Sequence, residues 1–345
     1  MKPVALGMHI YAGGFTLGVQ AAGFKTLAHL EEWNFGVKTS RDNLMIEVRT
    51  PVSNWRPEEF AGKVDLLYCN PPCAIFSVAG VSPIKERNVE KWKHDGRTNC
   101  TNLCFEMIGV IRPKMFIWEC VAAAFTKGRE FIEIKVKEVA KLGYRSHVVL
   151  FNGRDCGLPQ SRKRMFFVAS TLEFDPVLPK RSTYLTPKDV WSNLPKGHEI
   201  DCPEMNKRDI APLKWCHKNQ SRSIRGGWEA QNEVVMVNGK AKGRPPFVCQ
   251  SVLLDKPAGT ITGGDVYYHP TELRKLSVIE QQLLCGYPVD YEFKGRLGEK
   301  YQQIGKAVTP PAGEWIARQC KKAIENDEQT FETDMVVHDF IKANK

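Results

Sequence analysis

The first half of the chain alternates short apolar runs with segments of helical length. Strands are predicted at residues 4–10, 26–30, 64–69 and 115–118, and residues 147–151 with 165–169 form a hairpin-like edge. Helices fit between them at residues 15–22, 101–111 and 129–142. Strands that alternate with helices are typical of a mostly parallel sheet with both faces covered. We therefore expect an α/β, doubly wound fold.

The pattern changes near residue 172, where prolines, glycines and basic residues become frequent and helical periodicity fades. This change predicts a second, smaller and irregular domain. Helices are predicted again at residues 276–284 and 311–325, and the last one has no strands of its own, so we expect it to dock on the first domain. The final twenty residues are polar and are expected to fray. The predicted divisions are 1–172, 173–273 and 274–345.

Charge points to a polyanionic partner. The 345 residues carry a formal net charge of +10. Residues 205–246 hold nine Lys and Arg against three acidic residues, a local net charge of +6. A basic region of this kind is typical of nucleic-acid binding.

The eleven cysteines lack the paired spacings of a disulfide framework or a zinc site, so reduced thiols and no bound metal are expected. The chain has no apolar stretch of membrane-spanning length and no basic leader before one, which favours a cytoplasmic protein without membrane contact.

One thiol stands at a chemically informative place. The apolar run ending at Cys69 is followed by Asn70-Pro-Pro-Cys73, a rigid turn that presents Cys73. Ligands of open α/β sheets bind beyond the carboxyl ends of the strands, where a thiolate can meet both substrate and cofactor. Cysteine among apolar neighbours is also common as a small buried hydrophobe. Cys73 alone does not decide between these interpretations.

The order of several motifs decides it, because together they resemble the DNA cytosine-C5 methyltransferase family of bacteria and phages. The motifs are Pro71-Pro-Cys73, Trp118-Glu-Cys-Val121, Gln160-Ser-Arg-Lys-Arg164, Arg274-Lys-Leu-Ser-Val-Ile-Glu280 and Gln303-Ile-Gly-Lys-Ala-Val308. The resemblance as a whole covers residues 9 to 317 and leaves the basic segment where the family has its variable target-recognition domain.

The resemblance implies a Rossmann-like, class I methyltransferase fold that uses S-adenosyl-L-methionine and acts on double-stranded DNA. Cys73 would attack C6 of a flipped-out cytosine, and Glu119 would hold the ring at N3 and the exocyclic amine and protonate N3. Arg164 would contact the cytosine O2. Arg162 would support Glu119 or contact the DNA backbone.

The resemblance also implies a donor site. Tyr11, Gly13, Gly14 and Phe15 would form the turn against the methionine and the ribose. Glu32 would bind the ribose hydroxyls, with Glu31 as a neighbouring alternative, and Trp33 would stack on the adenine. The rest of the wall would come from Pro72, Gly305, Ala307 and Val308.

The chain departs from the family pattern at several positions. His9 stands where the first motif has an acidic residue, the following loop lacks two residues, and Lys306 replaces an asparagine of the last motif. Ala74 and Cys120 replace the usual glutamine and asparagine. His9 and Lys306 both add positive character near the donor, which suggests the hypothesis that a donor with an additional negative charge is tolerated.

Two other functions remain open at this point. A tRNA cytosine-C5 methyltransferase would use the same chemistry, but relatives of that kind have little in place of the long basic domain. A catalytically silent DNA-binding homologue would explain the altered first motif, but not the joint presence of Cys73, Glu119, Arg162 and Arg164. We expect a monomer. Restriction-modification, phage self-protection and an epigenetic role all need the same enzyme, so the sequence does not choose among these three roles.

Overall fold

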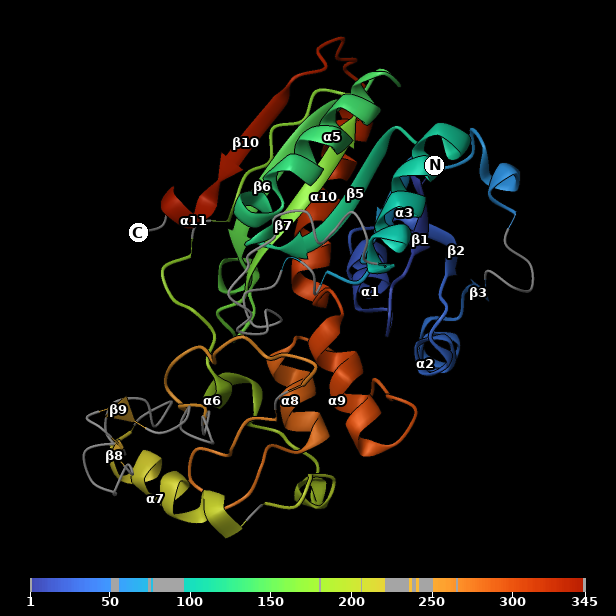
Figure 1. Cartoon of the computed structure of the whole chain (residues 1–345). Helices are drawn as coiled ribbons and strands as arrows, with labels where there is room; N and C mark the ends of the chain where they lie inside the picture. The colour runs from blue at the N-terminus through green and yellow to red at the C-terminus, as the bar shows by residue number, and fades with distance from the viewer. Residues whose placement is uncertain are drawn as a thin grey trace.

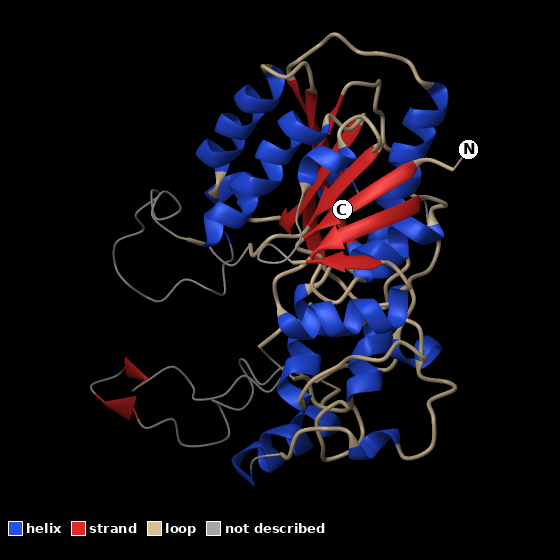
Figure 2. Cartoon of the chain, turned by 90° about the vertical axis from the view of Figure 1, so that its right-hand side faces the viewer, coloured by secondary structure: helices blue, strands red, loops and turns tan. Residues whose placement is uncertain are grey.

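The computed structural model describes residues 2–50, 56–73, 76, 96–179, 181–205, 207–220, 236–237, 240–241, 251–264 and 266–343. A sheet covered by helices forms one lobe, and shorter helices joined by long loops form a second lobe beside it (Figures 1 and 2). No helix in the described part of the chain is both long and apolar enough to cross a bilayer.

The central sheet has eight strands in the order β10-β6-β7-β5-β4-β1-β2-β3. Their bounds are β1 Val4–Met8, β2 Lys25–Leu30, β3 Glu47–Arg49, β4 Leu66–Cys69, β5 Met115–Val121, β6 Arg145–Asn152, β7 Lys163–Ser170 and β10 Met335–Asp339. Only β7 is antiparallel to its neighbours, β5 and β6. The predicted doubly wound, mostly parallel sheet is confirmed.

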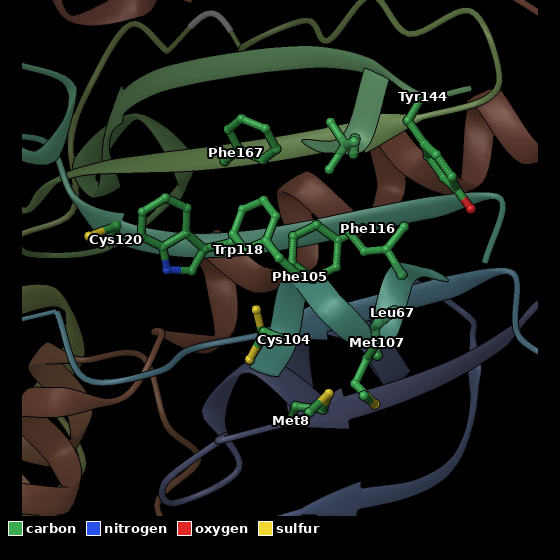
Figure 3. Packing of buried hydrophobic residues seen from close by; sticks show 14 of the residues in the cluster. Met8, Leu67, Cys104, Phe105, Met107, Phe116, Trp118, Cys120, Tyr144 and Phe167 are labelled. Carbon is green, nitrogen blue, oxygen red and sulfur yellow. The ribbon is translucent and has the colours of Figure 1, made fainter. Parts of the chain in front are cut away.

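Helices cover both faces of this sheet (Figure 1). Helices α1 (Gly14–Ala21) and α10 (Pro310–Asn326) share an apolar cluster with one face. The other face packs against α3 (Arg97–Ile111) and α5 (Arg129–Ala140), with Phe105 and Trp118 at the centre of an aromatic group shown in Figure 3. The prediction that the long C-terminal helix docks on the first domain is confirmed by the packing of α10 on α1.

The second lobe is largely irregular. Its helices are α6 (Pro187–Val190), α7 (Ile210–Lys218), α8 (Val278–Leu284) and α9 (Leu297–Lys306), and β8 (Met236–Val237) pairs with β9 (Lys240–Ala241). One apolar cluster joins Trp191, Leu276 and Ile304 of this lobe to Ala12 and Leu44 of the sheet lobe. The exact domain divisions stay predictions.

Smaller elements complete the described chain. They are α2 (Asn34–Leu44), α4 (Ala124–Lys127), α11 (Phe340–Ala343) and the 3₁₀ turns η1 (Pro57–Phe60), η4 (Gly153–Cys156), η5 (His198–Ile200) and η6 (Lys207–Asp209). The predicted strands and helices of the first half are all present, with ends that differ by a few residues.

The end of the chain differs from expectation. The prediction that the last twenty residues fray is wrong, because β10 pairs in parallel with β6 and becomes the edge of the sheet. The hairpin of β6 and β7 is consequently not an edge. His338 of β10 stacks on His147 of β6 at 5.5 Å between ring centroids. The short apolar run Val336-Val337 is too brief to distinguish from a polar tail by pattern alone.

Candidate active site

The loop that follows β4 carries Cys73. Pro71 is buried, and Cys73 is half-buried at the carboxyl end of the strand. The backbone N–H of Phe76 donates to the carbonyl of Cys73 at 3.1 Å, and the Phe76 ring packs against Trp118 and Phe131 with centroids 6.2 and 5.6 Å away. These aromatic contacts hold the Phe76 ring in the core, three positions after Cys73.

The surroundings of Cys73 favour its thiolate. The Cys120 side chain, the charge of Arg164 and the backbone N–H of Val121 lower the pKa of Cys73. Burial and the negative charge of Glu119 oppose this effect. The net direction is downward, which is the direction a nucleophilic thiol needs.

Glu119 projects from β5 next to the thiol and is 3% exposed. Its Oε1 lies 3.1 Å from Nε of Arg164, and its Oε2 accepts a hydrogen bond from Asn70 at 2.8 Å. Burial raises the pKa of Glu119 although Arg164 and Arg162 lower it. A carboxyl group in this state can carry a proton closer to neutral pH than an exposed one.

Asn70 is a site residue that the sequence reasoning did not single out. Its amide nitrogen donates to Glu119, and its amide oxygen accepts from the backbone N–H of Val308 at 3.2 Å. Asn70 therefore links the carboxyl group to the segment that follows α9. One sequence feature could have identified Asn70 as a site residue: it is polar, and it stands at the end of an apolar strand directly before two prolines.

Arg162 and Arg164 differ in what they contact. Arg164 pairs with Glu119, whereas the Arg162 guanidinium donates to the carbonyls of Ile261 and Gly305 at 2.6 and 2.9 Å. Arg162 is 3% exposed. The expectation that Arg162 contacts the DNA backbone is therefore corrected, because its donors are occupied inside the protein. It supports Glu119 only through its charge.

The two neighbouring acids at the end of β2 have different environments. The Glu31 carboxylate is 3% exposed and accepts backbone N–H groups from Tyr11, Glu32 and Trp33 at 2.6, 2.9 and 2.9 Å. Burial raises the pKa of Glu31 to about 7 in spite of these donors. The Glu32 side chain is 47% exposed, and its Oε1 lies 3.7 Å from Nδ1 of His9. Glu31 thus anchors the turn.

A cavity of about 480 Å³ opens beside Glu32. It is lined by Glu32, Asn99, Cys100, Asn102, Leu103 and Glu106. Ligand atoms of His9, Glu32 and Cys100 lie within 4.8 Å of one another, the only possible metal-ligating group within the described ranges. Burial raises the pKa of Cys100, however, which disfavours the thiolate that a metal would need.

The turn after β1 is tightly enclosed. A Cβ atom at Gly14 would lie 2.3 Å from the Val308 carbonyl oxygen, and Gly13 has a φ of +74°, so both positions require glycine. His9 and Tyr11 also have left-handed backbones, with φ of +52° and +53°. Such strain is common where a backbone is shaped for a ligand.

Phe15 has a different place from the one expected. Its side chain is fully buried between Tyr68 and Phe166, with ring centroids 4.9 and 5.8 Å away. The Phe15 side chain therefore supports the turn from within the core, and its role in donor binding stays a prediction.

The segment at the end of α9 is also tightly enclosed by neighbouring backbone. Gly305, Ala307 and Val308 are buried, and a Cβ atom at Gly305 would lie 2.2 Å from the carbonyl carbon of Thr262. Pro72 remains half-buried.

Lys306 and Trp33 lie together. The ammonium of Lys306 is 5.4 Å from the centre of the Trp33 ring and 3.0 Å from the Gln302 side-chain oxygen. No carboxylate of the described residues lies within ion-pair distance of it. Burial lowers the pKa of both Lys306 and His9. His9 is therefore neutral near pH 7, and the expectation that it adds positive charge is corrected.

Part of the predicted chemistry lies outside the described residues. This applies to Ala74 and to most of the basic segment, including Arg222, Arg225, Lys242 and Arg244.

The sheet, its helices and the paired thiol and carboxyl group define a Rossmann-like methyltransferase. The model of the C-5 cytosine-specific DNA methylase family matches residues 6–322, and the chain belongs to this family.

Curated relatives are similar over nearly the whole chain. The type II methyltransferase M.AplI of Arthrospira platensis is 26% identical over 94% of this chain and 87% of its own length. M1.HphI of Haemophilus parahaemolyticus is 26% identical over 92% and 86%.

Solved structures share the fold. A putative DNA modification methyltransferase from an E. coli prophage has a TM-score of 0.68 at 15% identity and covers 94% of this chain and 100% of its own. The methyltransferase EhMeth of Entamoeba histolytica has a TM-score of 0.62 at 13% identity, with coverages of 94% and 99%.

Proposed function

We propose that this DNA cytosine-C5 methyltransferase works through a covalent bond between Cys73 and C6 of a flipped-out cytosine, with S-adenosyl-L-methionine as donor. One observation carries the proposal. A half-buried thiol with a lowered pKa lies beside a buried carboxyl group with a raised pKa, and Arg164 is close to both. The two shifts bring the pKa values of a nucleophile and a general acid closer together.

The residues of the site have defined tasks in this reaction. The Cys73 sulfur forms a bond to C6, and the electron pair of the C5–C6 double bond moves into the ring as Glu119 gives a proton to N3. C5 thereby becomes nucleophilic. S-adenosyl-L-methionine supplies a methyl group on a positively charged sulfur. Once C5 carries the methyl group, loss of the C5 proton to solvent and return of the C6–S electron pair to Cys73 would restore the C5–C6 double bond and the thiolate. Return of the N3 proton to Glu119 would restore the neutral ring and the acid.

The residues around the cavity fit the donor. The exposed carboxylate of Glu32 suits ribose hydroxyls, and the cavity beside it has about 480 Å³. Gly13 and Gly14 permit close backbone approach, with Tyr11 in the same turn. Trp33 would offer the adenine the face that Lys306 does not cover, and Pro72 completes the entrance.

The DNA must release the target base from its stack, which costs a few kcal/mol. Neutralised phosphates provide compensating attraction, and the net charge of +10 supports this role. We propose double-stranded DNA as the substrate and a monomer that acts in the cytoplasm of a bacterial or phage-infected cell.

A trapping assay with 5-fluorocytosine DNA tests the covalent step. Fluorine at C5 cannot leave as a proton does, so the Cys73 bond should persist after methyl transfer and survive denaturation. We expect a DNA-protein adduct with the wild type and none with Cys73→Ser. Absence of an adduct with the folded wild type would refute the proposal. A matching RNA arm tests the tRNA alternative.

A second candidate function concerns the donor. Lys306 places an ammonium group next to the Trp33 ring without a carboxylate partner within the described ranges. A donor that carries a carboxylate on its transferred methyl group would supply that partner, and the product would be a carboxymethylated cytosine.

A competition between the two donors tests this candidate. We expect the wild type to transfer the carboxylated group, detected by mass spectrometry of the digested DNA, and Lys306→Asn to lose this preference. If only S-adenosyl-L-methionine reacts in both proteins, the candidate fails.

A further inference from the structure

The turn after β1, which the proposed function assigns to the donor, takes its hydrogen-bond partners from several elements. The backbone N–H of Tyr11 donates to Glu31 at 2.6 Å, and the Tyr11 carbonyl accepts from the Ser40 hydroxyl at 3.4 Å. The next carbonyl, that of Ala12, accepts from the hydroxyl group of Tyr291. Tyr291 lies between α8 and α9 of the second lobe, 279 residues further along the chain. The second lobe therefore contributes one of the bonds that hold the turn.

The Tyr291 ring is itself held in place by aromatic packing. It is 5% exposed, and its centroid lies 5.0 Å from that of Tyr287 and 5.3 Å from that of Phe293. Ala12 and Leu44 belong to the same apolar cluster. A ring packed on several sides has little rotational freedom, so its hydroxyl group has a defined direction.

The backbone next to Tyr291 is bonded to α2. The Asn43 side chain donates to the Glu292 carbonyl and accepts from the Glu292 N–H, both at 2.9 Å. The N–H of Lys294 donates to the Thr39 hydroxyl at 2.9 Å. These three bonds fix the segment that carries Tyr291 against the sheet lobe.

The turn leaves no alternative partner of another size at this place. Ala12 is 0% exposed, so its carbonyl has no access to water if the bond is lost. A Cβ atom at Gly13 would lie 2.9 Å from the Tyr291 hydroxyl oxygen. Tyr11 has a left-handed backbone, and such a conformation persists only where the surrounding contacts hold it.

We propose that Tyr291 is a positioning residue for donor binding, whose hydroxyl group holds the Ala12 carbonyl and with it the shape of the turn that receives the donor. The inference rests on the proposed donor site and deepens it. Tyr291 does not line the cavity beside Glu32, so it acts on the donor only through the backbone of the turn.

Tyr291→Phe tests the inference, because it removes the hydroxyl group and keeps the packed ring. We expect the Kd of S-adenosyl-L-methionine, measured by calorimetry without DNA, to rise about 3–10-fold, the range for one buried hydrogen bond. The KM for the donor should rise in the same proportion, whereas kcat at saturating donor and the KM for DNA should stay at wild-type values. Amides of residues 11–13 should exchange hydrogen faster in the free protein.

Tyr144→Phe is the matched control. Tyr144 is 1% exposed, and its hydroxyl group also donates to a backbone carbonyl, that of Pro113, at 2.5 Å. It stands directly before β6, at the opposite edge of the sheet from the turn. Tyr144→Phe should lose a comparable amount of thermal stability but keep the wild-type Kd for the donor and the wild-type exchange of residues 11–13.

The possible failures are distinguishable. Wild-type donor affinity in Tyr291→Phe overturns the inference alone, and so does an equal loss of affinity in Tyr144→Phe. Unchanged exchange of residues 11–13 in Tyr291→Phe also overturns it, and this measurement needs no donor. A wild type that binds no S-adenosyl-L-methionine refutes the proposed donor site, and the inference with it.

Discussion

At the scale of single residues, the site depends on opposite pKa shifts of two neighbouring groups. The pKa of Cys73 is lowered and that of Glu119 is raised. A thiolate forms as the pH rises through the pKa of Cys73, and the carboxyl proton is lost as the pH rises through that of Glu119. The two shifts narrow the gap between the two pKa values, and so they raise the fraction of molecules that hold both the thiolate and the protonated carboxyl group.

Replacement of Glu119 by glutamine separates these contributions. We expect methyl transfer to fall by about 10²–10⁴-fold, the usual contribution of a general acid. The pKa of Cys73 should fall further, because the repelling charge is removed. Initial rates and Cys73 alkylation, both against pH, check the two effects. Glu133→Gln removes an exposed acid that pairs with Arg129 on α5, and it should change neither. An unchanged rate for Glu119→Gln would exclude the general-acid role.

A second prediction at this scale concerns Asn70. Asn70→Ala removes the donor to Glu119 and the acceptor for Val308. We expect a loss of about 1–3 kcal/mol in the free energy of unfolding, because buried polar groups lose their partners. Asn70→Asp keeps the acceptor but adds a second carboxylate next to Glu119, so it should raise the pKa of Glu119 more strongly. Urea unfolding and rate-pH profiles measure both effects, and identical profiles for both variants would contradict this account.

At the scale of elements, the packing of α9 depends on one missing side chain. Gly305→Ala would place a methyl group 2.2 Å from the Thr262 carbonyl carbon and 2.3 Å from the Gly263 nitrogen. We expect a destabilisation of about 1–3 kcal/mol by overpacking. Gly298→Ala in the same helix meets nothing within 4 Å and should stabilise by up to about 1 kcal/mol. Urea unfolding compares them, and equal changes would refute the steric explanation.

Prediction from sequence was most successful where an element has a long or strongly apolar pattern. The runs that became β1, β4 and β5 were identified because every residue faces a covered side of the sheet. Strands β3 and β10 were missed, since three and five residues carry little periodicity and their pairing is long-range. Helix α2 was missed for a related reason, because Gly36, Thr39 and Ser40 make up most of its buried face and only Val37 and Leu44 are apolar side chains there.

The candidate site was predictable only in part for the same physical reason. Ordered motifs identified Cys73, Glu119 and Arg164, which the structure brings together around one carboxyl group. Asn70 bonds Glu119 and Val308, which are 49 and 238 residues away along the chain. The Arg162 guanidinium bonds Ile261 and Gly305, which are 99 and 143 residues away. Such contacts exist only after the chain has folded, so no local pattern contains them.

At the scale of the whole molecule, Arg162 connects the sheet to the second lobe. Its guanidinium donates to carbonyls at Ile261, in the loop of the second lobe, and at Gly305 and Ala307, at the end of α9. The segment after α9 also reaches Asn70 through the Val308 N–H. One buried side chain therefore links the two lobes next to the proposed catalytic groups.

The two arginines, two positions apart, allow this link to be tested separately from catalysis. Arg162→Met leaves buried carbonyls without donors, so we expect a loss of about 2–5 kcal/mol in stability. Amides of residues 261–263 and 305–308 should exchange hydrogen faster. Arg164→Met should also reduce the rate of methyl transfer, because Glu119 loses its ion-pair partner. It should leave amide hydrogen exchange in both segments unchanged. If both variants lose protection equally, the connection between the lobes depends on the general stability of β7 and not on the Arg162 guanidinium.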